Sequence, residues 1–221
     1  SNKDLVPPEL RSNSSSITAN SPAVARQERT ACTNCELRIT NCHGRTYTVG
    51  SESYPSVTSI LRATRSKTDA DKLRKWMHKM DDLHGAGAAD KFRDEAGIRG
   101  TKLHEAIALH FTGEKPTVEE SLEPFWNPLQ RILKCITFPQ YIESRVYHDQ
   151  LKYAGTLDLL AYWRGLPTLI DWKTSARLKK EAWMHEARLQ TAAYAGAVER
   201  MYDIKVEQTL IVVASPDNTQ C

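Results

Sequence analysis

Hydrophobic and polar positions follow two different periods along this chain. In the first half, apolar residues recur every three or four positions, which is typical of helices with one buried face. This spacing predicts helices over residues 69–84, 90–111 and 119–135. We expect the first helix to bury a face formed by Leu73, Trp76, Met77, Met80 and Leu83.

In the second half the apolar positions alternate or form short continuous runs, a pattern that favours strands. It predicts strands over 140–148, 153–163, 167–173 and 206–214, with one long helix over about 179–202. The second and the fourth of these strands are apolar on both faces, so we expect them to be buried. The alternation of strands and helices predicts an α/β fold in which helices flank a small mixed sheet.

The first part of the chain has a different composition. Residues 1–46 are mostly polar, with a low-complexity run from Ser12 to Ser16. We expect this segment to be disordered, apart from the cysteine-rich part near its end. The folded domain is expected over 47–221. Because a buried strand ends so close to the last residue, we expect further chain on that side.

Composition excludes some classes of protein. No apolar run reaches the roughly 18 residues that a membrane span needs. The net charge of +3 permits a nucleic-acid partner without arguing for one. The first 30 residues hold several acidic residues and therefore make no clear mitochondrial transit peptide.

The cysteines leave two alternatives open. Zinc could be bound by Cys32, Cys35, Cys42 and His43, since the first two have the C-x-x-C spacing of zinc sites. An unstructured tail with free thiols is the other interpretation. We expect no iron–sulfur cluster, because Cys221 is the one cysteine after the predicted core sheet and its helix, and a cluster normally takes four thiolates.

Two acidic residues interrupt apolar strands. Asp158 lies between Leu157 and Leu159, and Asp171 follows a similar run on the next strand. Buried carboxylates are costly unless they are paired or bind a metal. Strand alternation places Lys173 on the same face as Asp171, so these residues predict a metal-dependent hydrolytic site. A purely structural ion pair is the alternative.

The order of motifs extends this pattern. The sequence G155-T-L-D158, 12 further residues and D171-W-K173 resemble the core of the PD-(D/E)XK nucleases. A helical histidine upstream (His104) and a Q-xxx-Y motif downstream (Gln190 and Tyr194) resemble the RecB-like branch of that superfamily. Over about residues 54–214, the chain is similar to the mitochondrial genome maintenance exonuclease family.

The resemblance implies a role for each matching residue. Asp158 and Asp171 would bind Mg²⁺ or Mn²⁺, with His104 and the Trp172 carbonyl as further ligands, and Lys173 would be the catalytic lysine. The side chains expected to support the site or contact the nucleic acid are Gln190, Tyr194, Glu143 and Arg177, the last followed closely by Lys179 and Lys180. Each has a plainer alternative: a boundary histidine, helix packing, a paired strand residue or a solvated basic segment.

The resemblance also implies a function. It indicates exonucleolytic degradation of single-stranded DNA in mitochondria, by a protein that we expect to be monomeric. Three alternatives remain, namely a phage-type or repair nuclease with the same core, a catalytically silent nucleic-acid-binding module, and a zinc-dependent interaction module formed by the cysteine-rich segment.

Overall fold

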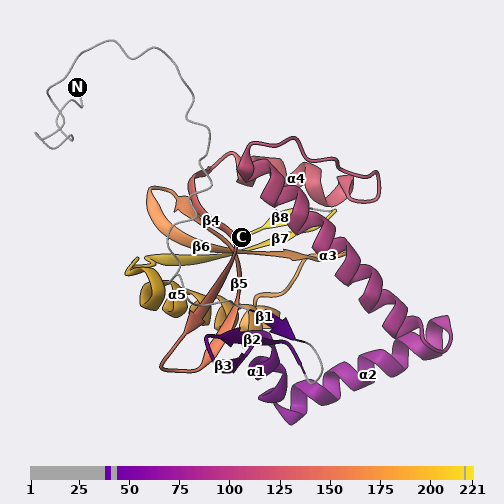
Figure 1. Ribbon diagram of the computed structural model, residues 1–221. Coiled ribbons are helices and arrows are strands. Elements are labelled where there is room, and N and C mark those ends of the chain that lie inside the picture. Colours follow the sequence, from indigo (N-terminus) through magenta and orange to yellow (C-terminus); the bar gives the residue numbers. More distant parts are fainter. Residues whose placement is uncertain (1–37, 41–43, 217) are drawn as a thin grey trace, which may run out of the picture.

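The computed structural model describes residues 38–40, 44–216 and 218–221 (Figure 1). The zinc site considered above, with Cys32, Cys35, Cys42 and His43, lies outside these residues, as does most of the segment expected to be disordered. Among the described helices, none has the length and apolarity needed to cross a membrane.

A five-stranded mixed sheet forms the centre of the molecule, with strand order β4-β5-β6-β7-β8 (Figure 1). Its strands are β4 (Ile136–His148), β5 (Tyr153–Trp163), β6 (Leu166–Thr174), β7 (Gln208–Ala214) and β8 (Thr219–Gln220). Strand β6 pairs in parallel with β7, and the other neighbours pair antiparallel. The predicted α/β fold with a small mixed sheet is confirmed.

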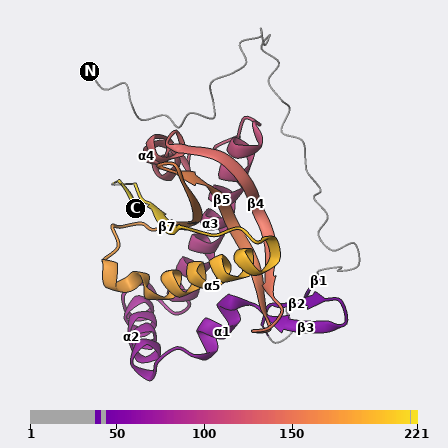
Figure 2. The ribbon, with the colours of Figure 1, turned by 90° about the vertical axis from the view of Figure 1, so that its left-hand side faces the viewer.

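Helices cover both faces of this sheet. One face packs on α3 (Ala88–Thr112) and α4 (Glu123–Leu133), with Leu103, Leu129 and Leu159 in the shared core. The other face packs on α1 (Val57–Ala63) and on α5 (His185–Tyr202), which crosses the sheet in Figure 2. Strands β5 and β6 are buried along most of their length, because helices cover them from both sides.

A second, smaller sheet was not predicted from the sequence. It contains β1 (Arg38–Thr40), β2 (Thr46–Val49) and β3 (Glu52–Pro55), all antiparallel. The Tyr47 hydroxyl lies 3.2 Å from the Thr156 hydroxyl and so links this sheet to β5. Strands of three or four residues are too short for a periodicity to be recognised.

Several predicted boundaries were wrong. The helix expected from residue 119 begins at Glu123, and its early proline falls in the first turn, where no backbone N–H is needed. The helix expected from 179 begins at His185, after the short 3₁₀ helix η2 (Glu181–Met184). The strand expected from 140 begins at Ile136, because a β-bulge separates its two paired segments.

Helix α2 (Lys67–His84) confirms the predicted helix but not its predicted burial. None of its residues is buried, and Leu83 is 63% exposed. The reason is visible in Figure 1, where α2 and the first half of α3 extend away from the sheet as an arm and meet at the turn near Gly85 and Gly87. We call α2 and residues 88–99 the arm.

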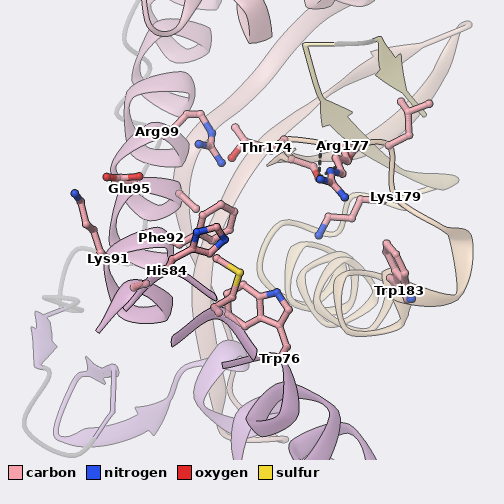
Figure 3. A pocket seen from close by; sticks show the side chains of 16 residues that line it. Trp76, His84, Lys91, Phe92, Glu95, Arg99, Thr174, Arg177, Lys179 and Trp183 are labelled. Carbon is pink, nitrogen blue, oxygen red and sulfur yellow. Dashed lines mark hydrogen bonds between the residues drawn. The ribbon is translucent and has the colours of Figure 1, made fainter. Parts of the chain in front are cut away.

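The arm and the segment after β6 enclose a groove of about 880 Å³ (Figure 3). Its first wall is formed by residues of α2 and α3 and its second by residues 174–179 and Trp183. The groove therefore begins directly after Lys173.

Candidate active site

Asp158 on β5 and Asp171 on β6 lie next to each other. The pairing of Leu159 with Ile170 places the two aspartates one step further along the adjacent strands. Both are buried, with 8% and 1% of their surface exposed. Burial, followed by the charge of Asp171, raises the pKa of Asp158 to about 7, and burial also raises the pKa of Asp171. Two carboxylates this close are unfavourable as ions unless a cation joins them.

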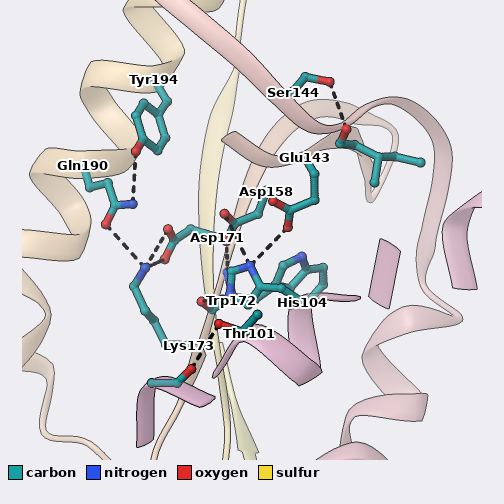
Figure 4. Close-up of polar contacts among 12 residues, drawn as sticks. Thr101, His104, Glu143, Ser144, Asp158, Asp171, Trp172, Lys173, Gln190 and Tyr194 are labelled. Atoms are coloured by element: carbon teal, nitrogen blue, oxygen red, sulfur yellow. Dashed lines mark hydrogen bonds and ion pairs between the residues drawn. The ribbon is translucent and has the colours of Figure 1, made fainter. Parts of the chain in front are cut away.

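Lys173 supplies one cation to this pair. Its Nζ atom lies 2.8 Å from Oδ1 and 2.7 Å from Oδ2 of Asp171. The expected juxtaposition of these two side chains on one face of β6 is therefore present (Figure 4). Asp158 makes a different contact, since its Oδ2 atom accepts a hydrogen bond of 2.8 Å from the Trp172 backbone N–H.

His104 approaches the same place from α3. Its Nδ1 atom lies 3.1 Å from a carboxylate oxygen of Glu143 and 3.7 Å from Oδ1 of Asp158, and its Nε2 atom donates to the Trp172 carbonyl at 3.1 Å (Figure 4). Burial by itself would lower the pKa of His104. The hydrogen bond to Glu143 and the charge of Asp158 outweigh burial and raise this pKa to about 9.

Glu143 is placed by an unusual backbone conformation. Its φ angle is +43°, in the left-handed region that side chains other than glycine seldom adopt. The register pairs Ile142 with Leu159 and Ser144 with Leu157, so Glu143 and Asp158 stand opposite each other between these pairs. A conformation of this kind costs about 1–3 kcal/mol and is concentrated at functional sites. Here it accompanies the contact of Glu143 with His104.

These three residues form a candidate metal site. One ligand atom from each of His104, Glu143 and Asp158 lies within 4.8 Å of the others. The set differs from the expected ligands in two respects. Glu143, expected at the periphery, contributes a carboxylate, while Asp171 bonds Lys173 and is not part of the group. The Trp172 carbonyl accepts the hydrogen bond from His104.

Gln190 and Tyr194 lie on α5 behind Lys173. Lys173 Nζ donates to the Gln190 side-chain oxygen at 3.4 Å, and Gln190 Nε2 donates to the Tyr194 hydroxyl at 3.4 Å (Figure 4). Tyr194 is 4% exposed, and burial raises its pKa, so its hydroxyl stays protonated. This chain of contacts leads from a buried tyrosine to the lysine of the site.

The role of Gly155 was missed in the sequence. A Cβ atom at this position would lie 2.3 Å from Cε1 of Tyr194, so the ring occupies the space that any side chain would need. The glycine of the G-x-x-D pattern was the available signal, but only the fold shows which residue lies over it.

Arg177 lies apart from the carboxylates, on the wall of the groove. In the part of the chain that the structure describes, its guanidinium makes no hydrogen bond or ion pair, and its carbonyl accepts a hydrogen bond from Ser175 Oγ. Lys179 also lines the groove, and Lys180 Nζ lies 5.7 Å from the centre of the Trp183 ring. This basic segment therefore lies beside the candidate site and outside it.

Comparison with known proteins identifies relatives of the chain. No family model matches it. It is 32% identical over 173 residues to the mouse protein mitochondrial genome maintenance exonuclease 1, a match that covers 76% of this chain and 51% of the mouse protein. The human protein of the same name is 31% identical over 172 residues, with 75% and 50% covered, and that of Xenopus tropicalis is 31% identical over 171 residues, with 75% and 49% covered.

These matches support membership of the mitochondrial genome maintenance exonuclease family. The family predicted from the sequence is thereby confirmed. The chain spans about half the length of the curated relatives it matches.

Proposed function

We propose that this chain forms the catalytic domain of a metal-dependent exonuclease that hydrolyses single-stranded DNA, in the maintenance of mitochondrial DNA. The names of the relatives support an exonuclease and a mitochondrial role. The observation that carries the proposal is the buried pair Asp158 and Asp171, which has Lys173 on one side and the ligand group of His104 and Glu143 on the other. A purely structural ion pair would need only Asp171 and Lys173.

The donor set fits a divalent cation. Two carboxylates and an imidazole converge on one point, and the ionised form of Asp158 is disfavoured in the absence of a cation. We therefore assign His104, Glu143 and Asp158 as the residues that would hold Mg²⁺ or Mn²⁺, with Asp171 and the Trp172 carbonyl adjacent. When bound, the ion would polarise the phosphate and lower the pKa of a water ligand.

The chain's own residues supply the remaining requirements. Lys173 is fixed between Asp171 and Gln190, so its ammonium group can orient an attacking water and offset negative charge on the phosphate. Gln190 and Tyr194 act as positioning residues for that lysine. We propose that the domain acts as a monomer.

A cleavage assay tests this proposal. The purified chain is incubated with Mg²⁺ or Mn²⁺ and single-stranded DNA that is linear, blocked at one end or circular. We expect linear DNA to shorten from a free end and circular DNA to survive. Lys173→Ala is expected to lower the rate about 100-fold or more, because it removes a charge aimed at the reacting group.

The control is Lys134→Ala, which removes an exposed lysine at the end of α4. Equal cleavage by wild type and Lys173→Ala would contradict the proposed site, and an inactive wild type would favour the silent binding module. Cleavage of circular DNA would instead favour an endonuclease with the same core.

A further inference from the structure

Three aromatic rings line the groove beside the site, and two of them are exposed. On the arm, Trp76 and Phe92 form an edge-to-face pair with ring centres 5.8 Å apart, and Phe92 is 42% exposed. On the opposite wall Trp183 is 62% exposed, on a 3₁₀ helix that has no buried residue. All three rings line the groove (Figure 3). Exposed aromatic surface on facing walls indicates a binding site for flat apolar groups.

The charges in the groove are mostly positive. Its basic side chains are Lys91 and Arg99 on α3 and Arg177 and Lys179 on the other wall, and its acidic side chain is Glu95. The basic residues of α3 divide into two sets. Arg93 pairs with Asp90, and Lys102 pairs with Glu119, outside the groove.

Lys91 and Arg99, which line the groove, make no ion pair with any residue that the structure describes. Arg177 on the opposite wall makes none with these residues either, so each wall offers an unpaired cation to a negatively charged ligand.

Arg99 is the most constrained of these cations. Its guanidinium lies 4.7 Å above the Phe125 ring, and its buried Nε atom lacks a hydrogen-bond partner among the described residues. A guanidinium held against an aromatic ring is already oriented, and its planar group can donate two parallel hydrogen bonds to a phosphate. In Figure 3, Arg99 faces Thr174, which directly follows Lys173.

Two elements, β6 and α3, contribute residues both to the groove and to the candidate active site. Thr174 and Ser175 extend β6 beyond Lys173, and Arg99 lies five residues before His104 on α3. A chain bound in the groove would therefore reach the carboxylates without leaving the surface between these elements.

We propose that this groove holds the single DNA strand leading to the site, with bases stacked on Trp76, Phe92 and Trp183 and phosphates bound by Arg99 and Arg177. The inference rests on the proposed nuclease function. Stacking needs the open face of an unpaired base, so the groove selects single strands over duplexes and does not select a base sequence. Charge on both walls holds the strand between the arm and the segment after β6.

Binding without cleavage tests the groove separately from the chemistry. A fluorescent oligothymidylate is titrated into the metal-free protein in EDTA at several salt concentrations. Trp183→Ala is expected to weaken binding about 5- to 100-fold with an unchanged salt slope, because it removes a stacking surface and no charge. Arg99→Ala is expected to weaken binding and reduce the salt slope by about 0.7, the value for one phosphate contact on a single strand.

Two matched variants serve as controls. Phe138→Ala removes an exposed aromatic ring outside the groove, and Arg93→Ala removes a charge from α3 outside the groove. Both should bind like wild type. A duplex of the same length should compete at least about tenfold more weakly, since its bases are already stacked.

The two proposals fail in different ways. In cleavage assays the groove variants should raise KM with little change in kcat, whereas Lys173→Ala should lower kcat. Unchanged binding by both groove variants would overturn the groove assignment and leave the nuclease proposal standing. Loss of binding in these variants, with no cleavage by wild type, would support the groove and overturn the nuclease. Because Trp183 is on the surface, its variant should fold normally, which circular dichroism checks.

Discussion

At the scale of single residues, the packing of Tyr194 on Gly155 helps to position the lysine of the candidate site. The Tyr194 ring is held in the core between the sheet and α5, and Gly155 leaves the space in which it lies. From the ring, contacts continue through Gln190 to Lys173. A change in the ring position would therefore be transmitted to the ammonium group of the site.

We predict that Gly155→Ala destabilises the fold and impairs cleavage. The new methyl group would lie 2.3 Å from the Tyr194 ring, which cannot move into solvent, so the strand or the ring must shift. Overpacking of this kind costs about 1–3 kcal/mol. The measurement is the denaturant midpoint of unfolding together with kcat.

Gly97→Ala is the matched control, because no atom lies within 4 Å of its added Cβ and it lies inside α3. It should leave stability unchanged or raise it by up to about 1 kcal/mol. If Gly155→Ala unfolded at the same midpoint as wild type, the packing argument would be wrong.

The residues of the site were predictable to different degrees. Asp158 and Asp171 stand out in the sequence because a charged residue inside an apolar strand needs a partner. Glu143 gave no such signal. Its contact with His104 accompanies a left-handed backbone conformation, which no side-chain pattern reveals.

At the scale of elements, α2 is the least anchored of the α-helices that the structure describes. It has no buried residue, and it contacts α3 through the Trp76–Phe92 pair. Just before the helix, Arg65 forms a bidentate ion pair with Glu186 at 2.7 and 2.9 Å. The helical period was readable in the sequence. Its burial was not, because an apolar stripe can face a groove as well as a core.

We predict that the amide protons of α2 exchange faster than those of β5. Elements with few buried contacts open locally at a low free-energy cost, whereas β5 opens only with the core. Hydrogen exchange followed by mass spectrometry measures both segments in one sample. Phe92→Ala should accelerate exchange in α2 and leave β5 unchanged. Equal protection of the two segments would show that the arm is part of the cooperative core.

At the scale of the whole molecule, the strands and helices around the site could be predicted because they have long, regular periods. The three-stranded sheet could not, because its strands of three or four residues are too short to show a period. The groove could not, because it depends on contacts between segments far apart in sequence. The same fold brings like charges together. Three carboxylates lie close together beside His104 and Lys173, namely those of Asp158, Asp171 and Glu143. Their repulsion and burial lower the free energy of unfolding of the metal-free protein.

This cost has a definite pH dependence. The pKa of Asp158 is raised from 3.8 to about 7 in the folded state, so folding favours its protonated form. The resulting stabilisation is complete below about pH 4 and is lost as the pH rises through 7. The pKa of His104 is raised to about 9, and its contribution is likewise lost as the pH rises toward that value. Metal-free protein should therefore become less stable from about pH 4 to 9.

We predict that Asp158→Asn stabilises the metal-free protein at pH 8 and abolishes its stabilisation by Mn²⁺. Asparagine keeps an acceptor for the Trp172 N–H and removes the buried charge. The expected gain is about 1–4 kcal/mol, since one pKa unit corresponds to about 1.4 kcal/mol. Wild type should instead gain about 2.7 kcal/mol at a Mn²⁺ concentration 100 times Kd.

Asp149→Asn provides the contrast for this measurement. The hydrogen bond from Arg200 lowers the pKa of Asp149 to about 2, so its charge is favourable in the folded state and its removal should bring no gain. Thermal unfolding of the three proteins at pH 5 and pH 8, with EDTA or Mn²⁺, separates these effects. The buried-charge argument fails if Asp158→Asn is less stable than wild type in EDTA at pH 8, or if Mn²⁺ stabilises it as much as wild type. Its success would explain why the domain retains a buried carboxylate that its fold does not need.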